Sequence, residues 1–382
     1  MVVRWMIGLA LVGQLMAESP TLQGVSETMD GFIQDGEMAG SVTLVADTKD
    51  LLHLGANGLS DRESKTAMTT DALFWIASMT KPVTGTAVMM LAEEGRLSIE
   101  DPVAKHLPEF NKLRDAKGEP VEVTIRQLMT HSSGLEEISR EEAQGITTLA
   151  ELTALVVEKP VKFEPGSQWK YCQTGINTAA RVVEVVSGQT FPEFLEARLF
   201  GPLGMKDTSF YPSEPQVKRL ATSYLREEDG KLEKTGIRHL LGMAPGDTRR
   251  YPMAHAGLFT TAEDYARFCR MVLNEGELDG RHYLKPESVK QMTSVLSGDL
   301  VTGFTPGNGW GLGWCVVRKP QGVSAVLSPG SFGHGGAYGT QVWIDPEKER
   351  VYLLMVQRAN FPNADASEVR KGFQEAVEAA LE

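Results

Sequence analysis

The segment Leu73-Phe74-Trp75-Ile76-Ala77-Ser78-Met79-Thr80-Lys81 consists of an apolar run followed by a serine and a lysine three residues apart. From Ser78 onward apolar residues recur at helical spacing, and Gly95 is placed to end that helix. At the start of a helix, residues three apart share a face, so the Lys81 amine can reach the Ser78 hydroxyl. A neutral lysine can accept the proton that a free serine holds too tightly for nucleophilic attack. A serine at a helix start is also a common N-cap, so this spacing alone is a weak signal.

A second candidate element is Tyr171-Cys172-Gln173, which follows Phe163-Glu164-Pro165-Gly166-Ser167 and precedes a helix expected over residues 176–186. A phenol near a lysine ammonium can have a lowered pKa and pass on a proton. A neighbouring side-chain amide can bind a substrate carbonyl. For an isolated tyrosine, a half-buried ring with a satisfied hydroxyl is the better interpretation.

Glycines surround a histidine in the third element, His334-Gly335-Gly336-Ala337. Glycine-rich sequence in a strand often marks the close approach of a ligand to the backbone. A substrate that lies along such a strand can pair with it, and a backbone N–H can then face its carbonyl oxygen. A glycine bulge beside a structural histidine explains the same residues about equally well.

In this order, the three elements resemble the serine β-lactamase, DD-peptidase and family VIII esterase superfamily. The similarity runs from about Met38 to Val356 and includes the context of the motifs. The similar segments are 73–77, 163–167, Leu128-Met129-Thr130-His131-Ser132-Ser133-Gly134-Leu135, Pro202-Leu203-Gly204-Met205, Gly257-Leu258-Phe259 and Trp310-Gly311-Leu312-Gly313-Trp314. The resemblance implies a hydrolase that acts through an acyl-serine on an ester, a D-amino peptide or a β-lactam.

The resemblance also implies the catalytic roles. Ser78 matches the nucleophile that is acylated. Lys81 and Tyr171 match the general-base pair, and which of them takes the proton stays open. By analogy, the backbone N–H groups of Ser78 and Ala337 would form the oxyanion hole.

The substrate-binding positions depart from the family pattern in two places. The second motif usually ends in Asn, whereas this chain has the longer Gln173. In typical β-lactamases the third motif begins with Lys, whereas this chain has His334 before Gly335 and Gly336. Because a histidine carries no fixed charge near neutral pH, its grip on a β-lactam carboxylate is weaker. We therefore expect ester or short-peptide turnover to exceed β-lactam turnover.

The strand pattern predicts an α+β fold, and the resemblance implies that this fold is of the β-lactamase and DD-peptidase type. Strands at both chain ends should form one antiparallel sheet, flanked by helices, with a helical region inserted between them. The sheet region covers about 18–75 and 310–382, and the helical region about 76–309, within one domain over 18–382. Expected strands lie at 40–47, 51–59, 312–317, 339–344 and 351–356, and expected helices at 22–35, 261–275, 285–292 and 364–381.

The N-terminus has the layout of a secretory signal peptide. A basic Met1-Val2-Val3-Arg4 precedes an apolar run from Trp5 to Val12, and Leu15-Met16-Ala17 ends in a small residue at the expected cleavage site. The run is too short for a transmembrane helix, which needs about 20 residues. We expect a secreted or periplasmic protein, with residues 1–17 removed and no stable membrane anchor. A buried N-terminal helix is the alternative.

The net charge and the cysteines limit the kinds of partner and cofactor to be expected. A formal charge of −12 argues against nucleic acid, whose phosphates require a basic face. Cys172, Cys269 and Cys315 lack metal-site spacing and are interpreted as small buried apolar residues. No metal or organic cofactor is expected, and the partner is a small molecule or short peptide. The oligomeric state stays open.

Other functional classes were weighed against this one. A non-catalytic binding or scaffold protein of the same fold is the main alternative. An α/β-hydrolase needs G-x-S-x-G, and both Thr130–Gly134 and Pro329–Gly333 lack its first glycine. A zinc hydrolase is disfavoured because there is no H-E-x-x-H, and His131, His255 and His282 are interpreted as ordinary satisfied histidines.

Overall fold

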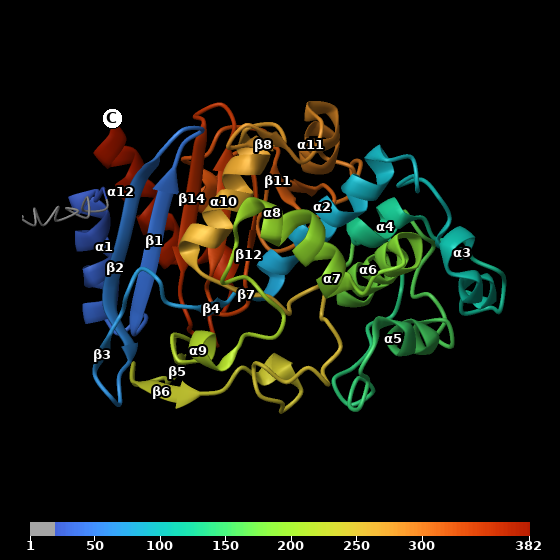
Figure 1. The fold of residues 1–382 in the computed structure, drawn as a ribbon, viewed down its shortest axis with the longest axis horizontal. Helices are drawn as coiled ribbons and strands as arrows, with labels where there is room; N and C mark the ends of the chain where they lie inside the picture. Colours follow the sequence, from blue (N-terminus) through green and yellow to red (C-terminus); the bar gives the residue numbers. More distant parts are fainter. Residues whose placement is uncertain (1–19) are drawn as a thin grey trace, which may run out of the picture.

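An eight-stranded antiparallel sheet joins the two ends of the chain (Figure 1). The computed structural model describes residues 20–382, so the predicted signal peptide lies outside the described residues. The strand order is β10-β11-β12-β13-β14-β1-β2-β3. The strands are β1 (Gly40–Ala46), β2 (Leu51–Asp61), β3 (Thr66–Ala67), β10 (Asn308–Trp310), β11 (Cys315–Val317), β12 (Phe332–Gly335), β13 (Gln341–Asp345) and β14 (Arg350–Met355). The predicted fold class is confirmed.

The first strand, β1, lies inside the sheet between β14 from the end of the chain and β2 from its beginning, so it joins the two chain ends. Val42 is opposite Met355 of β14 and Ala56 of β2. Every residue of β1 is buried, so both faces of the strand are covered. Leu44 points into the core beneath the helical region, and the adjacent Val45 points into the core beneath the terminal helices, as the two-residue period of a strand requires.

Two helices from opposite ends of the chain cover one face of the sheet: α1 (Gln23–Gln34) and α12 (Glu368–Leu381) (Figure 1). The other face carries α10 (Ala262–Leu273) and the inserted helical region. Its two central helices, α2 (Thr80–Glu93) and α6 (Gln173–Ser187), pack against each other. The shorter helices of the chain are α3 (Val103–His106), α4 (Ile125–Met129), α5 (Leu149–Val156), α7 (Phe191–Leu195), α8 (Gly201–Leu203), α9 (Glu214–Val217) and α11 (Pro286–Thr293).

Three details of the predicted elements were wrong. The strand expected at 312–317 begins only at Cys315, because Gly311 and Trp314 close a turn in which Gly313 has φ +75°. The closing helix starts at Glu368 behind a Ser367 cap, after a short 3₁₀ turn. The middle of the chain also holds small antiparallel ribbons: β4 (Phe74–Trp75) with β7 (Phe259–Thr260), β5 (Ser223–Arg226) with β6 (Leu232–Thr235), and β8 (Glu277–Leu278) with β9 (Arg281–His282).

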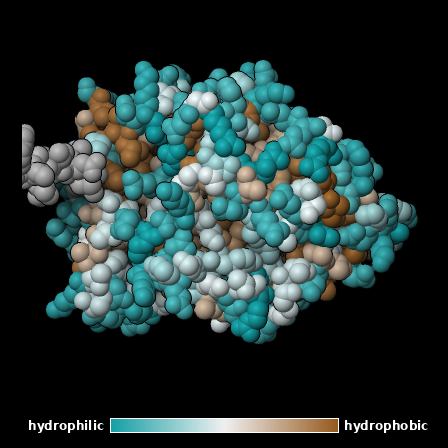
Figure 2. Space-filling model, viewed as in Figure 1, coloured by the Kyte–Doolittle hydropathy of each residue, from teal (hydrophilic) through white to brown (hydrophobic). Residues whose placement is uncertain are grey.

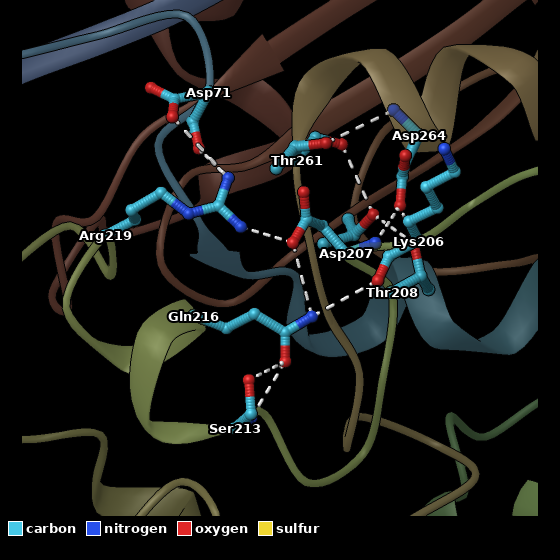
Figure 3. A network of polar contacts seen from close by, with 10 residues as sticks. Asp71, Lys206, Asp207, Thr208, Ser213, Gln216, Arg219, Thr261 and Asp264 are labelled. Carbon is cyan, nitrogen blue, oxygen red and sulfur yellow. Dashed lines mark hydrogen bonds and ion pairs between the residues drawn. The ribbon is translucent and has the colours of Figure 1, made fainter.

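A polar network fastens the segment after α8 to the start of α10 (Figure 3). The Asp207 N–H and the Thr208 hydroxyl donate to the Asp264 carboxylate at 2.6 and 3.0 Å. Asp207 in turn pairs with Arg219. The Arg219 guanidinium donates to the Asp71 carbonyl at 2.9 Å, and the Arg219 carbonyl accepts from Leu73 N–H at 2.9 Å. The network therefore reaches the chain just before β4.

The surface is mostly hydrophilic on the face in Figure 2, with hydrophobic residues in separate patches. Cys172, Cys269 and Cys315 are buried free thiols, as predicted. None of the helices within residues 20–382 has the length and apolar character required to cross a bilayer.

Candidate active site

Ser78 lies on a tight turn between a short strand and a long helix. β4 ends at Trp75, a 3₁₀ turn spans Ala77–Met79, and α2 begins at Thr80. Ala77 has φ +47°, which is uncommon for a residue with a side chain. The Thr80 hydroxyl donates to the Ala77 carbonyl at 2.7 Å and so helps to hold this strained backbone. Ser78 keeps part of its surface exposed, although the residues beside it are buried.

The Lys81 amine is fully buried beside the serine. It donates to Ser78 Oγ at 2.9 Å and to the backbone carbonyl of His255 at 2.8 Å. Burial lowers the pKa of Lys81 to about 7, although the charges of Glu137 and Asp365 act in the opposite direction. Near neutral pH a large fraction of this amine is therefore uncharged and can accept a proton.

Tyr171 comes from the chain just before α6 and completes a cluster with the first two residues. Ser78 lies close enough to the phenol to lower its pKa against the larger effect of burial, and the ring centroid lies 4.7 Å from Lys81 Nζ. Burial raises the pKa of the Tyr171 phenol well above its usual value. The sequence left open which residue of the pair takes the serine proton, and the two pKa directions favour Lys81.

His334 lies on β12, next to the tyrosine. Its Nδ1 is 2.7 Å from the Gly335 carbonyl, which can only accept, so Nδ1 carries the proton. Its Nε2 then faces the Tyr171 hydroxyl at 3.5 Å as an acceptor. Burial lowers the pKa of His334 to about 3, so the ring is neutral at physiological pH.

The glycines of the third motif allow a close approach between β12 and the serine turn. A Cβ atom at Gly335 would overlap the Asp365 carboxylate, and one at Gly336 would overlap the Thr340 hydroxyl. Without those atoms, Gly336 packs against the Ile76 carbonyl, two residues before Ser78. Ala337 follows directly and is exposed.

The clearest contact of Gln173 is made by its backbone and not by its side chain. Gln173 N–H donates to the Glu137 carboxylate at 2.5 Å, and Thr174 N–H does so at 3.0 Å. The glutamate thereby satisfies two of the free N–H groups that start α6. The Gln173 side chain is partly exposed.

Sequence reasoning missed three contributors because they act through backbone or packing. His255 supplies its carbonyl to Lys81. Glu137 caps α6 and faces the lysine. His131 packs against Tyr171 with ring centroids 4.4 Å apart, and its Nε2 is buried without a hydrogen-bond partner among residues 20–382. The prediction that His131 is an ordinary satisfied histidine was therefore wrong.

Cavities near the cluster are small. A cavity of about 150 Å³ borders Tyr171, Cys172 and Glu137. A larger one of about 1210 Å³ lies between α10 and α11 and holds none of the residues described above. Within residues 20–382 no three His, Cys, Asp or Glu side chains converge as a metal site requires.

The profile of the Beta-lactamase family matches residues 24–375. The chain belongs to this family. Esterase EstB of Burkholderia gladioli is 30% identical over 362 residues, which cover 86% of this chain and 88% of the esterase. Penicillin-binding protein 4 of Amycolatopsis lactamdurans is 32% identical over 317 residues, which cover 82% and 79%.

A solved structure shares the architecture of this chain. It is EstCE1, described as a hydrolase with promiscuous acyltransferase activity, and it superimposes with a TM-score of 0.78 at 26% identity. The match covers 93% of this chain and 97% of EstCE1. The resemblance drawn from the motifs is thus confirmed: this is a β-lactamase-family hydrolase related to esterases and penicillin-binding proteins.

Proposed function

We propose that this β-lactamase-family member is a secreted serine hydrolase that cleaves esters or short peptides through an acyl-serine at Ser78. The observation that carries the proposal is the buried Lys81 amine, 2.9 Å from Ser78 Oγ and with a pKa of about 7. An amine in this state can remove the serine proton at neutral pH, which nucleophilic catalysis by serine requires.

The proposed reaction has two halves. The Ser78 Oγ–H proton passes to Lys81 while Oγ bonds to the substrate carbonyl carbon, and the backbone N–H groups of Ser78 and Ala337 stabilise the oxyanion. The bond to the leaving alcohol or amine then breaks, and that group takes up the proton with Tyr171 in the relay. Water hydrolyses the acyl-serine, which releases the acid and restores Ser78.

Two observations support an uncharged substrate near the third motif. His334 is neutral, so it offers no fixed cation to a carboxylate. Phe304 is half exposed, with its ring edge-on to Tyr171 at 4.8 Å, so an apolar group of the substrate has a surface to contact. The neutral His334 favours esters, or peptides without a free carboxylate at this position, over β-lactams, and Gln173, His334, Gly335 and Gly336 are the proposed substrate contacts.

Ser78→Ala tests the nucleophile. The rate at which the variant hydrolyses p-nitrophenyl butyrate should fall by about 10⁴-fold or more, because replacing one residue of a catalytic unit removes most of the unit's contribution. A fluorophosphonate probe should add mass to the Ser78 peptide of the wild type only. Ser331→Ala, which changes another buried serine, is the matched control and should retain activity. Near-normal turnover by Ser78→Ala, or a wild type that the probe never labels, would favour the non-catalytic alternative.

Secretion is part of the proposal because residues 1–17 have the layout of a signal peptide. N-terminal sequencing of the protein from its own host should give a start near Glu18. A protein that starts at Met1 would contradict the proposed cleavage and secretion.

A further inference from the structure

His131 occupies an unusual place for a core histidine. It follows the end of α4 with φ +60°, a left-handed backbone that side chains rarely adopt, and its side chain is fully buried. The ring lies among the aromatic rings of Trp169, Tyr171 and Trp310, with centroids 5.9, 4.4 and 5.1 Å away. A position that combines backbone strain, burial and an unpartnered Nε2 calls for a physical reason.

The hydrogen bonds of the ring give one. His131 Nδ1 lies 3.1 Å from both the N–H and the carbonyl oxygen of Cys172. Cys172 is the N-cap residue of α6, so its carbonyl accepts the first bond of that helix. Its N–H has no such partner and can only donate, so Nδ1 is the acceptor and the ring proton is on Nε2. Burial lowers the pKa of His131 well below its usual value, which keeps the ring in this neutral form.

The same histidine holds the chain on both sides of Tyr171. Cys172 N–H donates to the imidazole, and Lys170 N–H donates to the His131 backbone carbonyl at 2.9 Å. The imidazole also packs against the Tyr171 ring at an interplanar angle of 37°. Two backbone bonds and one ring contact therefore fix the direction in which the phenol points.

We propose that His131 is a positioning residue that holds the Tyr171 phenol against Ser78 and over the Lys81 amine. The proposal rests on the proposed function, because it concerns the orientation of a group in the same reaction. His131 itself does not touch the substrate. Its imidazole acts through one accepted hydrogen bond and one packed face.

Two variants distinguish the contribution of the accepted hydrogen bond from that of the packed ring. Asn tolerates the left-handed backbone, and in His131→Asn the Oδ1 can accept from Cys172 N–H in place of Nδ1. His131→Phe keeps a ring against Tyr171 but has no acceptor. We expect kcat for p-nitrophenyl butyrate to fall by about 10²-fold in His131→Phe and by less than about tenfold in His131→Asn, since a misplaced proton-transfer group loses most of its contribution. KM should change little in either.

A double-mutant cycle distinguishes positioning from a general effect on the fold. If His131 acts through Tyr171, His131→Phe should add less than about twofold to the loss already caused by Tyr171→Phe, because coupled residues are not additive. If the histidine only supports the fold, the two losses should multiply. His131→Gly replaces the phenylalanine variant in the cycle if that variant does not fold, because glycine adopts the left-handed backbone freely.

The pH profile gives a second readout. The Tyr171 ring covers the Lys81 amine, so a displaced ring admits water and should move the acidic limb of kcat/KM to higher pH. Glu137, Asp365 and Cys172 also face Lys81, together with the neutral rings of His255 and His334, and the variants leave these groups in place. The limb should move in His131→Phe and stay in His131→Asn.

His53→Phe is the matched control. His53 is also fully buried, and its Nδ1 accepts from Leu22 N–H at 2.9 Å, but it lies on β2, away from the serine. It should lower stability without moving the pH limb. Wild-type kcat and an unmoved limb in His131→Phe, or multiplicative losses in the cycle, would overturn the positioning role while Ser78 is still labelled. An unlabelled, inactive wild type would overturn the proposed function, and the positioning role with it.

Discussion

At the scale of single residues, the ionisation of the Lys81 amine controls the proposed reaction. The amine must be uncharged to take the Ser78 proton, and its pKa is about 7. As pH rises through 7 the amine loses its proton, so kcat/KM for p-nitrophenyl butyrate should increase about tenfold per pH unit below 7 and level off above it. Because kcat/KM reports the free enzyme, the midpoint measures this pKa directly.

Lys81→Met provides the comparison for that profile. It removes the amine while keeping an unbranched apolar side chain in the buried site, so kcat/KM should fall by about 10²–10⁴-fold and the acidic limb should disappear. A wild-type profile that is flat between pH 5.5 and 8.5 would exclude Lys81 as the proton acceptor.

His334 should decide between uncharged and anionic substrates. His334→Lys would offer a cation to a β-lactam carboxylate, and a hydrogen bond to a charged group contributes about 1.5–3 kcal/mol. Burial beside Lys81 opposes a second cation, so we expect the low end, about a tenfold rise in the nitrocefin to p-nitrophenyl butyrate ratio of kcat/KM. His282→Lys, at an exposed position, should leave the ratio unchanged. A wild type that strongly prefers nitrocefin would refute this interpretation of His334.

Residue-level prediction from sequence worked where chemistry is local. Ser78 and Lys81 are three residues apart, so helical geometry alone predicts their contact. Tyr171 and His334 were weak candidates from the residues alone and took their roles from the family resemblance; in the structure Tyr171 lies beside Lys81, and His334 lies beside Tyr171. The His255 carbonyl could not be anticipated, because any residue type supplies the same backbone oxygen and only the fold determines which one arrives.

At the scale of elements, the buried Asp264 at the start of α10 couples stability to pH (Figure 3). Burial raises the pKa of Asp264 to about 6, above its usual value of about 3.8. Well below the unfolded pKa of about 3.8, the carboxyl is protonated in both the folded and unfolded states. As pH rises from 4 to 6, the unfolded chain releases this proton before the folded protein does, so the stability contributed by this group falls.

Asp264→Asn should remove this dependence. One pKa unit corresponds to about 1.36 kcal/mol, so the free energy of unfolding of wild type relative to the variant should fall by about 2–3 kcal/mol between pH 4 and 7. Urea unfolding at both pH values measures it. Asp50→Asn, at an exposed turn, is the control and should show no such change. A constant difference between wild type and Asp264→Asn would contradict the burial argument.

Helices and strands were predictable from the sequence where one spacing of apolar residues continued over several residues. The strands around Val42 and Leu353 read directly from their apolar runs, since both are buried on two faces. The ribbons β4–β7 and β8–β9 have two-residue strands, too short to show a period. The turn at Gly311–Trp314 was missed because its apolar side chains resemble those of a strand, while Gly313 supplies the left-handed backbone.

At the scale of the whole molecule, the serine turn lies where the sheet and the helical region meet. Gly336, directly after β12, packs on the Ile76 carbonyl, and the Thr340 hydroxyl donates to the same oxygen at 3.3 Å. The proposed nucleophile and oxyanion hole therefore depend on both regions. The composition of either region alone carries no sign of this junction, because it requires residues about 260 positions apart to touch.

The shared core predicts how the molecule unfolds. Length alone favours two units, because single cores rarely grow beyond about 250–300 residues. The packing argues otherwise: one continuous apolar cluster contains Val42 and Leu353 of the sheet together with Val83 and Ile176 of the helical region. Separating the two regions would expose that cluster, at about 25 cal/mol per Å² of apolar surface, so neither should melt alone. We expect one calorimetric transition, with the far-UV and tryptophan signals changing together. Two resolved transitions, or a proteolytic fragment of either region that stays folded, would show that the regions are separate domains.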